Sequence, residues 1–453
     1  MGLPPTPPLP GALQTLLWIR RPTETMRYCR ERYGPTFRIK LPMFEIVLLS
    51  DPSAIRTVFA ARSDEMHAGE FNRILRVLVG DSSVLLLDGS EHMRHRKLLM
   101  PSFHGERMRL YGATMAEITR TVMAGWPEDR AFAIHPQTQE ITLQVILRTV
   151  FGADEGAQAS ALSARIKKML SIAEHRIAVL PMLYLSQRPE LEKRAPARWL
   201  LRRRDAMDAL LYQQISARRG DQDDAARTDV LAMLMQARDE QGEGMSDVEL
   251  RDELVTALAA GHETTATALA WALERVLGHP RVHARLLDEV RALGTEPEPE
   301  KLAALPYLDA VVKETLRMRP VVPVVGRILQ KPYRLGGYDL PAGTAVAPCV
   351  YLAHHDPQVY PEPFAFEPER FLDVQPDPAS FLPFGGGLRR CVGATFALYE
   401  TKIVLGTMLA AYDFTLAQDG PARIVRRAVT LWPEGGTRVL ATKAGTRHAS
   451  PAN

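Results

Sequence analysis

The hydrophobic pattern of the chain has a helical period over most of residues 89–320, and short, broken apolar runs on either side. The clearest helix starts at Ser246, where Ser246 and Glu249 form a capping box ahead of a long run rich in Ala and Leu. The run continues to Gly278, before Pro280, so its roughly 33 residues span roughly 50 Å at about 1.5 Å per residue. A helix of this length that is apolar on most faces is expected to cross the centre of the molecule.

Shorter periodic segments predict further helices. They cover residues 53–61, 92–100, 117–126, 139–151, 280–293, 308–318 and 392–412. Residues 36–40 and 45–49, around Pro42, have the pattern of two paired strands, and short strands are also expected after Pro320 and in the tail. The pattern therefore predicts a mainly α fold with small β-sheets.

Nothing in the sequence divides the chain into parts. Its 453 residues contain no Gly/Ser linker, single-sign charge block or repeat, and 46% are hydrophobic, so we expect one domain over residues 1–453. Residues 1–11 are rich in proline and predict an extended N-terminal arm. The apolar stretch 12–19 is far shorter than the roughly 20 residues of a membrane span, so no transmembrane segment is expected. We expect it to pack on the protein body, with contact to a membrane surface as the alternative.

Charge and cysteine content narrow the possible partners and compartment. The chain has 56 basic and 53 acidic residues, a net charge of +3, which gives no reason to expect nucleic acid. No signal peptide is evident. Three cysteines do not make a disulfide framework, so a reducing cytoplasm is the expected location.

The cysteine with the most informative surroundings is Cys391. Residues 384–393 read Phe-Gly-Gly-Gly-Leu-Arg-Arg-Cys-Val-Gly, so Cys391 follows a glycine-rich loop at the expected start of a helix. Backbone N–H groups and the helix dipole favour a thiolate there, which suits a soft metal ion or haem iron. The glycines would let the backbone approach a flat ligand. Cys29 and Cys349 lack such neighbours and are expected to be buried and inert. A zinc site on Cys391 is the weaker alternative, because no second Cys or His lies at ligand spacing.

The same ten residues match the haem-binding signature of the cytochromes P450, Phe-x-x-Gly-x-x-x-Cys-x-Gly, at every fixed position. Residues 260–265, Ala-Gly-His-Glu-Thr-Thr, match the family's oxygen-activation motif, and Glu314-x-x-Arg317 and the Pro368–Phe371 segment follow in the family's order. The chain therefore resembles the cytochromes P450. The resemblance implies the P450 fold, with haem between the long central helix and the helix that follows the cysteine loop.

The resemblance implies a role for each matching residue. Cys391 is expected to be the metal ligand, the proximal thiolate of the haem iron, with Glu263 bringing in protons and Thr264 holding dioxygen as the catalytic pair. The basic residues expected to contact the haem propionates are His92, Arg96, Arg327 and Arg389. Other parts of the haem are expected to contact Ala260, Phe384, Gly385 and Gly393. Glu314, Arg317 and Arg370 are expected to form a structural network. Arg94 and His95 fall on other faces of their helix and are expected at the surface.

The implied substrate pocket is mostly apolar. Its expected lining is the segment from Phe71 to Leu87, together with Thr256, Ala259, Val322, Val324, Leu431 and Trp432. Such a lining suits an apolar small molecule with few polar anchors. A stretch from Arg96 to Met108 also resembles bacterial P450s that oxidise fatty acids and terpenoids, although a shared fold does not fix the substrate.

The resulting expectation is a monomeric haem-thiolate monooxygenase that hydroxylates or epoxidises a terpenoid, fatty acid or steroid-like molecule. It would use haem b (iron protoporphyrin IX), with O₂ as co-substrate. No flavin fingerprint is evident in this chain, so electrons are expected from a separate ferredoxin and ferredoxin reductase. Arg390, Lys402 and residues 94–97 are candidates for a basic docking patch, with ordinary solvated charge as an equal alternative. Two other functions stay open: a P450-fold peroxygenase or isomerase, and a non-catalytic haem-thiolate sensor.

Overall fold

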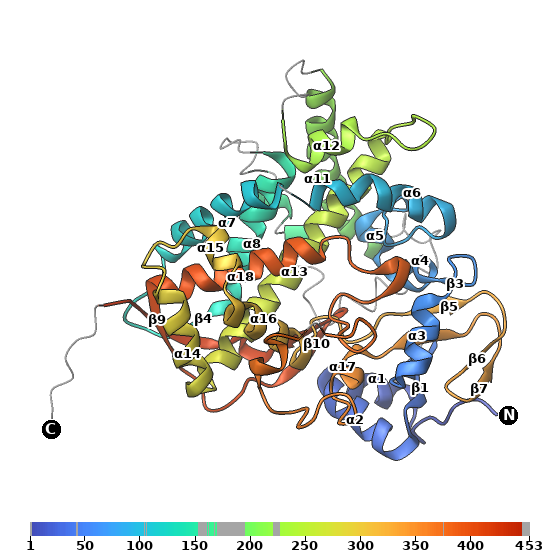
Figure 1. Cartoon of the computed structure of the whole chain (residues 1–453). Coiled ribbons are helices and arrows are strands. Elements are labelled where there is room, and N and C mark those ends of the chain that lie inside the picture. Colours follow the sequence, from blue (N-terminus) through green and yellow to red (C-terminus); the bar gives the residue numbers. More distant parts are fainter. Residues whose placement is uncertain are drawn as a thin grey trace.

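The long helix predicted from the sequence is α13 (Asp247–Leu277), and it runs through the middle of the molecule in the computed structural model (Figure 1). The predicted capping box is confirmed: Glu249 N–H donates to Ser246 Oγ at 3.3 Å, and Ser246 N–H donates to Glu249 Oε2 at 2.7 Å. The structure describes residues 2–41, 44–103, 105, 107–152, 161, 163–166, 168–169, 195–220, 227–374 and 376–445.

Helices make up most of the described chain. Before α13 they are α1 (Gly11–Arg20), α2 (Pro22–Tyr33), α3 (Pro52–Ala60), α4 (Ala68–Phe71), α5 (Arg76–Val79), α6 (Gly89–Leu99), α7 (Arg107–Met123), α8 (Ile134–Phe151), α11 (Ala195–Arg219) and α12 (Val230–Gln236). After it come α14 (Pro280–Arg291), α15 (Pro299–Ala303), α16 (Pro306–Met318), α17 (Val350–His354) and α18 (Ala394–Ala411). Short 3₁₀ helices cover Asn72–Leu75, Met100–Phe103, Pro368–Phe371, Gly387–Arg389 and Glu434–Gly436.

Most predicted helices are confirmed, and two begin earlier than expected. The predictions for α3, α6, α14, α16 and α18 agree with the structure within three residues at each end. Helix α7 begins ten residues before the predicted position 117, because Met108, Tyr111 and Met115 already bury one of its faces. Helix α8 begins at Ile134 rather than 139. Helices α2 and α11 were not predicted, since polar and charged residues dominate their sequences.

The strands form a mixed sheet beside the helices. They are β1 (Thr36–Lys40), β2 (Glu45–Leu49), β3 (Met66–His67), β4 (Phe132–Ala133), β5 (Arg327–Leu329), β6 (Tyr333–Leu335), β7 (Tyr338–Leu340), β8 (Ala345–Pro348), β9 (Tyr412–Leu416), β10 (Ile424–Arg427), β11 (Thr430–Pro433) and β12 (Arg438–Lys443). The main sheet has the order β1-β2-β8-β5-β3, in which β2 and β8 are parallel. The predicted strand pair is confirmed as the antiparallel β1–β2 hairpin. Smaller sheets are β10–β11, β4–β12–β9 and β6–β7.

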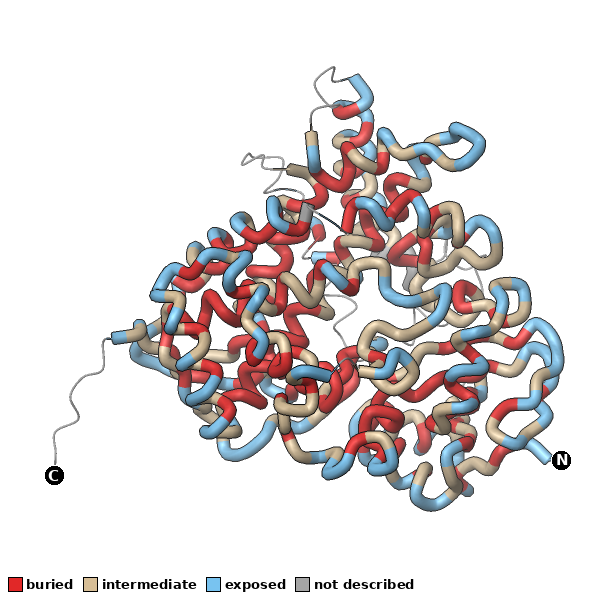
Figure 2. The backbone as a smooth tube through the Cα atoms, in the orientation of Figure 1, coloured by how far each residue is buried: buried red, intermediate tan, exposed pale blue. Residues whose placement is uncertain are grey.

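The largest apolar core lies around α13, where α8, α7, α16 and α18 bring buried faces together (Figure 2). Trp271 of α13 is fully buried, and its Nε1–H donates to the Leu431 carbonyl at 3.0 Å, which joins α13 to β11. A Cβ on Gly261 would lie 3.2 Å from Ile146, so this glycine permits a close approach of α8 to α13.

The N-terminal residues pack on the sheet. Residues 2–10 form neither helix nor strand, and the Pro4 and Pro5 carbonyls accept hydrogen bonds from Arg38 of β1. In α1, Trp18 is buried, whereas Leu13 and Leu16 are exposed. Among the residues that the structure describes, no helix combines the length and the apolar character needed to cross a membrane.

Candidate functional site

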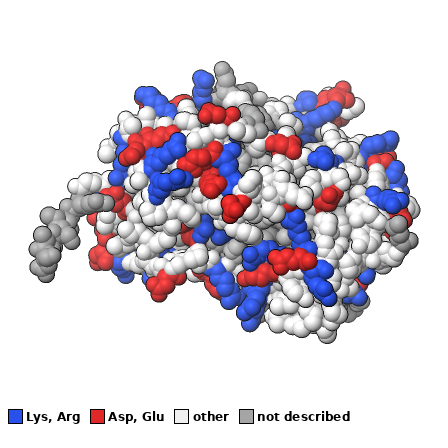
Figure 3. All heavy atoms as spheres, turned by 60° about the horizontal axis from the view of Figure 1, so that its bottom comes forward, with Lys and Arg blue, Asp and Glu red and all other residues white. Residues whose placement is uncertain are grey.

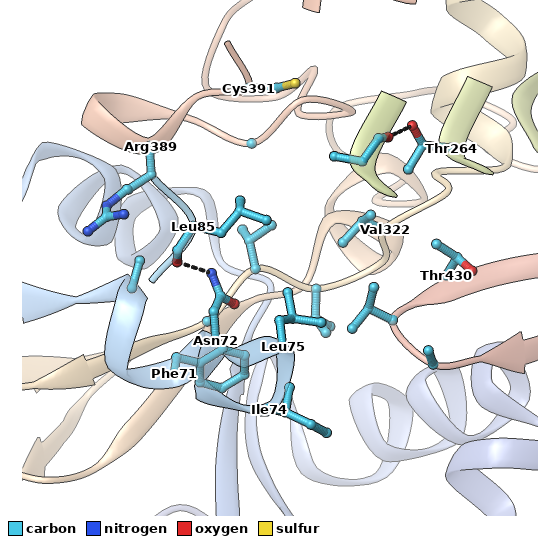
Figure 4. Close-up of a pocket in the computed structure, with 18 of the residues that line it drawn as sticks. Phe71, Asn72, Ile74, Leu75, Leu85, Thr264, Val322, Arg389, Cys391 and Thr430 are labelled. Atoms are coloured by element: carbon cyan, nitrogen blue, oxygen red, sulfur yellow. Dashed lines mark hydrogen bonds between the residues drawn. The ribbon is translucent and has the colours of Figure 1, made fainter. Parts of the chain in front are cut away.

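A cavity of about 1580 Å³ lies between α13, the loop before α18 and the short helices α4 and α5 (Figure 4). Figure 4 shows Cys391 on the loop and Thr264 on α13 on one side of this space, with Phe71, Ile74 and Leu75 on the other. Ligand pockets usually measure about 300–1000 Å³, so this cavity has room for a large prosthetic group and a further molecule.

The loop that carries Cys391 is fixed by its own backbone and by α3. The Cys391 N–H donates to the Phe384 carbonyl at 2.9 Å, and Phe384 packs on the main core. Gly387 has φ +63°, and a Cβ there would lie 2.0 Å from the Phe59 carbonyl oxygen. The expected reason for the glycines was therefore incomplete. At least one of them is required by the loop's own conformation and by its contact with α3, rather than by a flat ligand.

The Cys391 side chain is exposed, and it lines the cavity. Burial within the surrounding protein raises the pKa of this thiol, while the Gly393 N–H, Arg96 and Arg390 lower it. Burial is the largest of these effects, so the pKa of the free thiol is raised overall, and the helix start at Ala394 does not by itself favour the thiolate. A bound metal ion is what removes the proton from a coordinating thiol. Cys29 and Cys349 are fully buried, and burial raises their pKa to about 11 and about 12.

In the α13 motif, the side chains of Thr264 and Glu263 have different partners. Thr264 Oγ1 donates to the Ala260 carbonyl at 2.6 Å, and both residues line the cavity. Glu263 also lines it, but its carboxylate is held from the α8 side. Gln139 Nε2 donates to Glu263 Oε2 at 2.7 Å, and His135 Nε2 lies 3.6 Å from Oε1. Burial first, and then Arg427, lower the pKa of His135 to about 3, so this ring is neutral.

The four basic side chains expected to contact the propionates all line the cavity: His92, Arg96, Arg327 and Arg389. His92 is buried, and its Nδ1 has no hydrogen-bond partner among the described residues. Burial, then Arg389, lowers the pKa of His92 to about 3. Burial likewise lowers the pKa of Arg327 and of Arg389 to about 10. Crowded, buried cations of this kind are stabilised by anionic partners.

Arg389 already has one such partner. Its Nη2 donates to Asp88 and to the Leu87 carbonyl, and its Nη1 donates to the Val84 carbonyl at 3.1 Å. Arg389 therefore ties the cysteine loop to residues 84–88, a role that the sequence did not predict. The expected contact with a propionate would have to share this guanidinium with Asp88.

The prediction that Arg94 and His95 lie at the surface is wrong. His95 is buried between two acids of α13, with Nδ1 2.7 Å from Glu253 Oε1 and Nε2 3.1 Å from Glu249 Oε1. Arg94 is half-buried and donates to Asp239 at 2.6 Å and to Glu249 at 2.7 Å. Burial alone would lower the pKa of His95, but the two carboxylates outweigh it and raise this pKa. These bonds attach α6, which carries His92 and Arg96, to α13.

Glu314, Arg317 and Arg370 lie together as one charged group. Glu314 and Arg317 are fully buried, and two bonds of 2.6 Å and 2.8 Å join them. The other Arg317 donors reach the carbonyls of His354, Pro363 and Ala365. Arg370 Nε lies 3.6 Å from Glu314 Oε1, which places Arg370 at the edge of the group. The pair therefore fixes the backbone between His354 and Glu367 against α16.

The structure brings together most, but not all, of the expected pocket residues. Lining residues include Phe71, Thr256, Ala259, Val322, Val324 and Trp432. Leu87 and Leu431 do not line the cavity, which corrects two predictions. Side chains alternate along a strand, so in β11 Thr430 and Trp432 line the cavity while Leu431 is buried elsewhere. That alternation could have been read from the sequence. Asn72, Ile74, Leu75 and Leu85 also line the cavity, and they lie within the expected segment 71–87 (Figure 4).

The sequence model of the family described as cytochrome P450 matches residues 3–441. The chain belongs to the cytochrome P450 family. Cytochrome P450 135B1 of Mycobacterium tuberculosis is 43% identical over 441 residues, which cover 97% of this chain and 91% of the relative. Cytochrome P450 135A1 of the same organism is 35% identical, over 96% of this chain and 94% of the relative. A cyanobacterial structure described as retinoic acid bound CYP120A1 superposes with a TM-score of 0.83 at 26% identity, covering 98% of this chain and all of that chain.

The family makes this P450 an oxidoreductase of the haem-thiolate monooxygenase type. Three observations fit a haem: the size of the cavity, the Cys391 thiol on one wall, and His92 Nδ1, which has no partner among the described residues and lies beside buried arginines that suit two propionates. Among the described residues no three His, Cys, Asp or Glu side chains gather as a metal site, so nothing there favours zinc.

Proposed function

We propose that this P450 inserts one atom of O₂ into a C–H or C=C bond of an apolar terpenoid, fatty acid or steroid-like molecule, while the other atom leaves as water. The balance needs two electrons and two protons from outside the substrate. The observation that supports the proposal is the cavity itself, which places Cys391 and Thr264 beside apolar walls such as Phe71, Leu75 and Val322. An apolar lining with few polar groups favours a hydrophobic substrate.

The residues around the haem would divide the work of binding it. Cys391 would ligate the iron, and the thiolate-bound haem supplies the activation of O₂ when it is bound. His92, Arg96 and Arg327 would hold the propionates by charge-assisted hydrogen bonds, with Arg389 shared between a propionate and Asp88. Phe384, Gly385 and Gly393 would shape the loop, and Ala260 would leave room beside α13.

Glu263 and Thr264 would deliver the protons. The Thr264 hydroxyl can turn from the Ala260 carbonyl to a group in the cavity, because a hydroxyl rotates to suit its partner. The Glu263 side chain is 17% exposed and lies beside neutral donors of α8, so it can exchange protons with water. A proton would then pass from Glu263 to the Thr264 side of the helix.

A Thr264→Val variant is expected to lose most of its product while still consuming O₂. Valine keeps the shape of threonine but removes the hydroxyl, and positioned proton transfer is worth about 10²–10⁴-fold in rate. We expect product formed per O₂ consumed to fall by about 10²-fold or more, with the electrons appearing as hydrogen peroxide. The measurement compares product, O₂ and peroxide in one reaction.

Thr407→Val is the matched control, because Thr407 is buried on α18 with an Oγ1 that has no hydrogen-bond partner among the described residues. This control should keep the coupling of the wild type. Coupling that stays normal in Thr264→Val would remove Thr264 from the proposed relay.

Electrons would come from a separate ferredoxin and ferredoxin reductase. The predicted basic docking patch is weaker than expected, because three of its members pair with acids: Arg94, Lys97 with Glu240, and Lys402 with Asp309. Basic and acidic side chains are also interspersed over the face in Figure 3. The support for a ferredoxin is therefore the family resemblance rather than a one-sign surface.

Reconstituted turnover tests the proposed function. The haem-loaded protein, a ferredoxin, its reductase and NADPH would be incubated under ¹⁸O₂ with terpenoids, fatty acids, steroids and retinoic acid, the ligand named for the similar cyanobacterial structure. One labelled oxygen in the product is expected. Turnover with peroxide but none with O₂ would favour a peroxygenase, and the absence of any substrate-dependent O₂ consumption would favour a sensor.

A further inference from the structure

The cavity extends to the N-terminal helix. Thr15, Trp18 and Ile19 of α1 line it, together with Arg426 of β10. Helix α1 packs against β10, so these residues share one wall. The cavity thus joins Cys391 and Thr264 to a region built by parts of the chain far away in sequence.

Arg426 is a buried cation with an unusual lack of partners. Its residue is 6% exposed, and its Nε and Nη2 have no hydrogen-bond partner in the described part of the chain. The guanidinium carbon lies 4.3 Å from the centroid of the Trp18 ring, so one face is covered by the indole. That contact partly offsets the cost of burying the charge, but it leaves the N–H edge unused.

Other buried arginines have the carboxylate partner that Arg426 lacks. Arg218, Arg251, Arg275 and Arg317 each pair with a carboxylate at 3.1 Å or less. Only Arg327 and Arg426, among the buried arginines of the described residues, pair with no carboxylate, and both line the cavity. A haem propionate would pair with Arg327. A buried unpaired charge is costly, so Arg426 also points to an anionic ligand.

We propose that Arg426 binds the carboxylate of an amphipathic substrate, whose apolar chain runs along the cavity toward Thr264. This rests on the proposed function and narrows its substrate class to apolar carboxylic acids. The guanidinium edge matches a carboxylate with two parallel hydrogen bonds. One unpaired guanidinium matches one negative charge, whereas a phosphate group carries about −1.5 to −2.

Binding of the substrate carboxylate by Arg426 also predicts which carbon is oxidised. A substrate held by its carboxylate at the α1–β10 wall would present the carbons remote from the carboxylate to the α13 side of the cavity, beside Thr264. Positioning of this kind favours one geometry over many. Oxidation is therefore expected toward the far end of the chain, and over a wider range of carbons when the anchor is removed.

The test uses the haem-loaded full chain and isothermal titration calorimetry with two matched pairs of probes, myristic acid with myristyl alcohol and retinoic acid with retinol. The variants are Arg426→Met, Arg426→Lys and, as control, Arg423→Met. Arg423 lies just before β10, and its side chain is 49% exposed and 3.5 Å from Glu434. Wild type and the control should bind each acid at least about tenfold more tightly than its alcohol, the least that a charge-assisted pair is worth.

In Arg426→Met this preference should vanish while the affinity for the alcohols stays unchanged, and Arg426→Lys should retain part of it. Equal binding of acid and alcohol by the wild type would overturn the proposal. Equal weakening of both probes in Arg426→Met would do the same, because it would mean that Arg426 only supports α1 through Trp18. Failure of the proposed function is distinguishable: labelled oxygen would then be missing from all products, whatever the affinity for acids.

Discussion

A Cys391→Ser variant is expected to lose monooxygenase activity by more than about a hundredfold, even when haem is bound. Loss of groups that merely tune a metal ligand typically costs about 10–100-fold, so loss of the ligand itself should cost more. A serine oxygen is a harder, less electron-rich donor than a thiolate, which pushes electron density onto the iron. The measurement is turnover per bound haem with ferredoxin and reductase supplied.

The control for this variant is Cys29→Ala, because Cys29 is fully buried in the core between α2 and the sheet. It should keep turnover per haem, even if the protein becomes somewhat less stable. Wild-type turnover by Cys391→Ser would contradict the assignment of Cys391 as the ligand.

An Arg317→Met variant is expected to lose about 3–5 kcal/mol of its free energy of unfolding, which is the usual cost of leaving one member of a buried ion pair alone. Glu314 is fully buried and would keep only the Glu367 N–H, at 2.9 Å, and the more distant Arg370 as partners. The carbonyls of His354, Pro363 and Ala365 would lose their donors at the same time. Urea unfolding followed by circular dichroism measures this loss.

Arg370→Met is the matched comparison, because Arg370 is 14% exposed and reaches Glu314 only at 3.6 Å. Its loss should cost about 1 kcal/mol or less, as for other ion pairs near the surface. Equal losses in the two variants would contradict the central place given to Arg317 in this network.

The helices with strong local signals could be predicted from the sequence. Ser246, Glu249 and Pro280 mark the ends of α13 by capping chemistry that acts within a few residues, so the structure agrees closely. The motif residues Thr264 and Cys391 were also recognisable, because their order along the chain is that of the family. Both line one cavity in the structure.

Contacts between distant segments could not be predicted in this way. The spacing of His95 places it on another helix face than His92, but only the folded chain brings Glu249 and Glu253 against that face. Arg426 looks like any charge on a polar strand until α1 covers it with Trp18. Burial of this kind depends on pairs of residues more than a hundred positions apart, and local patterns do not contain it.

The explanation of a motif can also change when its position is confirmed. The glycines of the cysteine loop were expected to make room for a flat ligand. In the structure Gly387 adopts a positive φ and lies against the backbone of Phe59, while Gly261 of the α13 motif makes room for Ile146 of α8. A glycine in a motif therefore predicts a close approach, but only the folded structure shows which atoms make it.

The absorption spectrum of the reduced, CO-treated wild-type protein, taken beside Cys391→Ser, tests the central claim most directly. We predict that the wild type shows the Soret band typical of thiolate-ligated haem and that Cys391→Ser does not. The same band in Cys391→Ser, or a wild-type band typical of histidine-ligated haem, would contradict the claim that Cys391 is the ligand of a haem-thiolate monooxygenase.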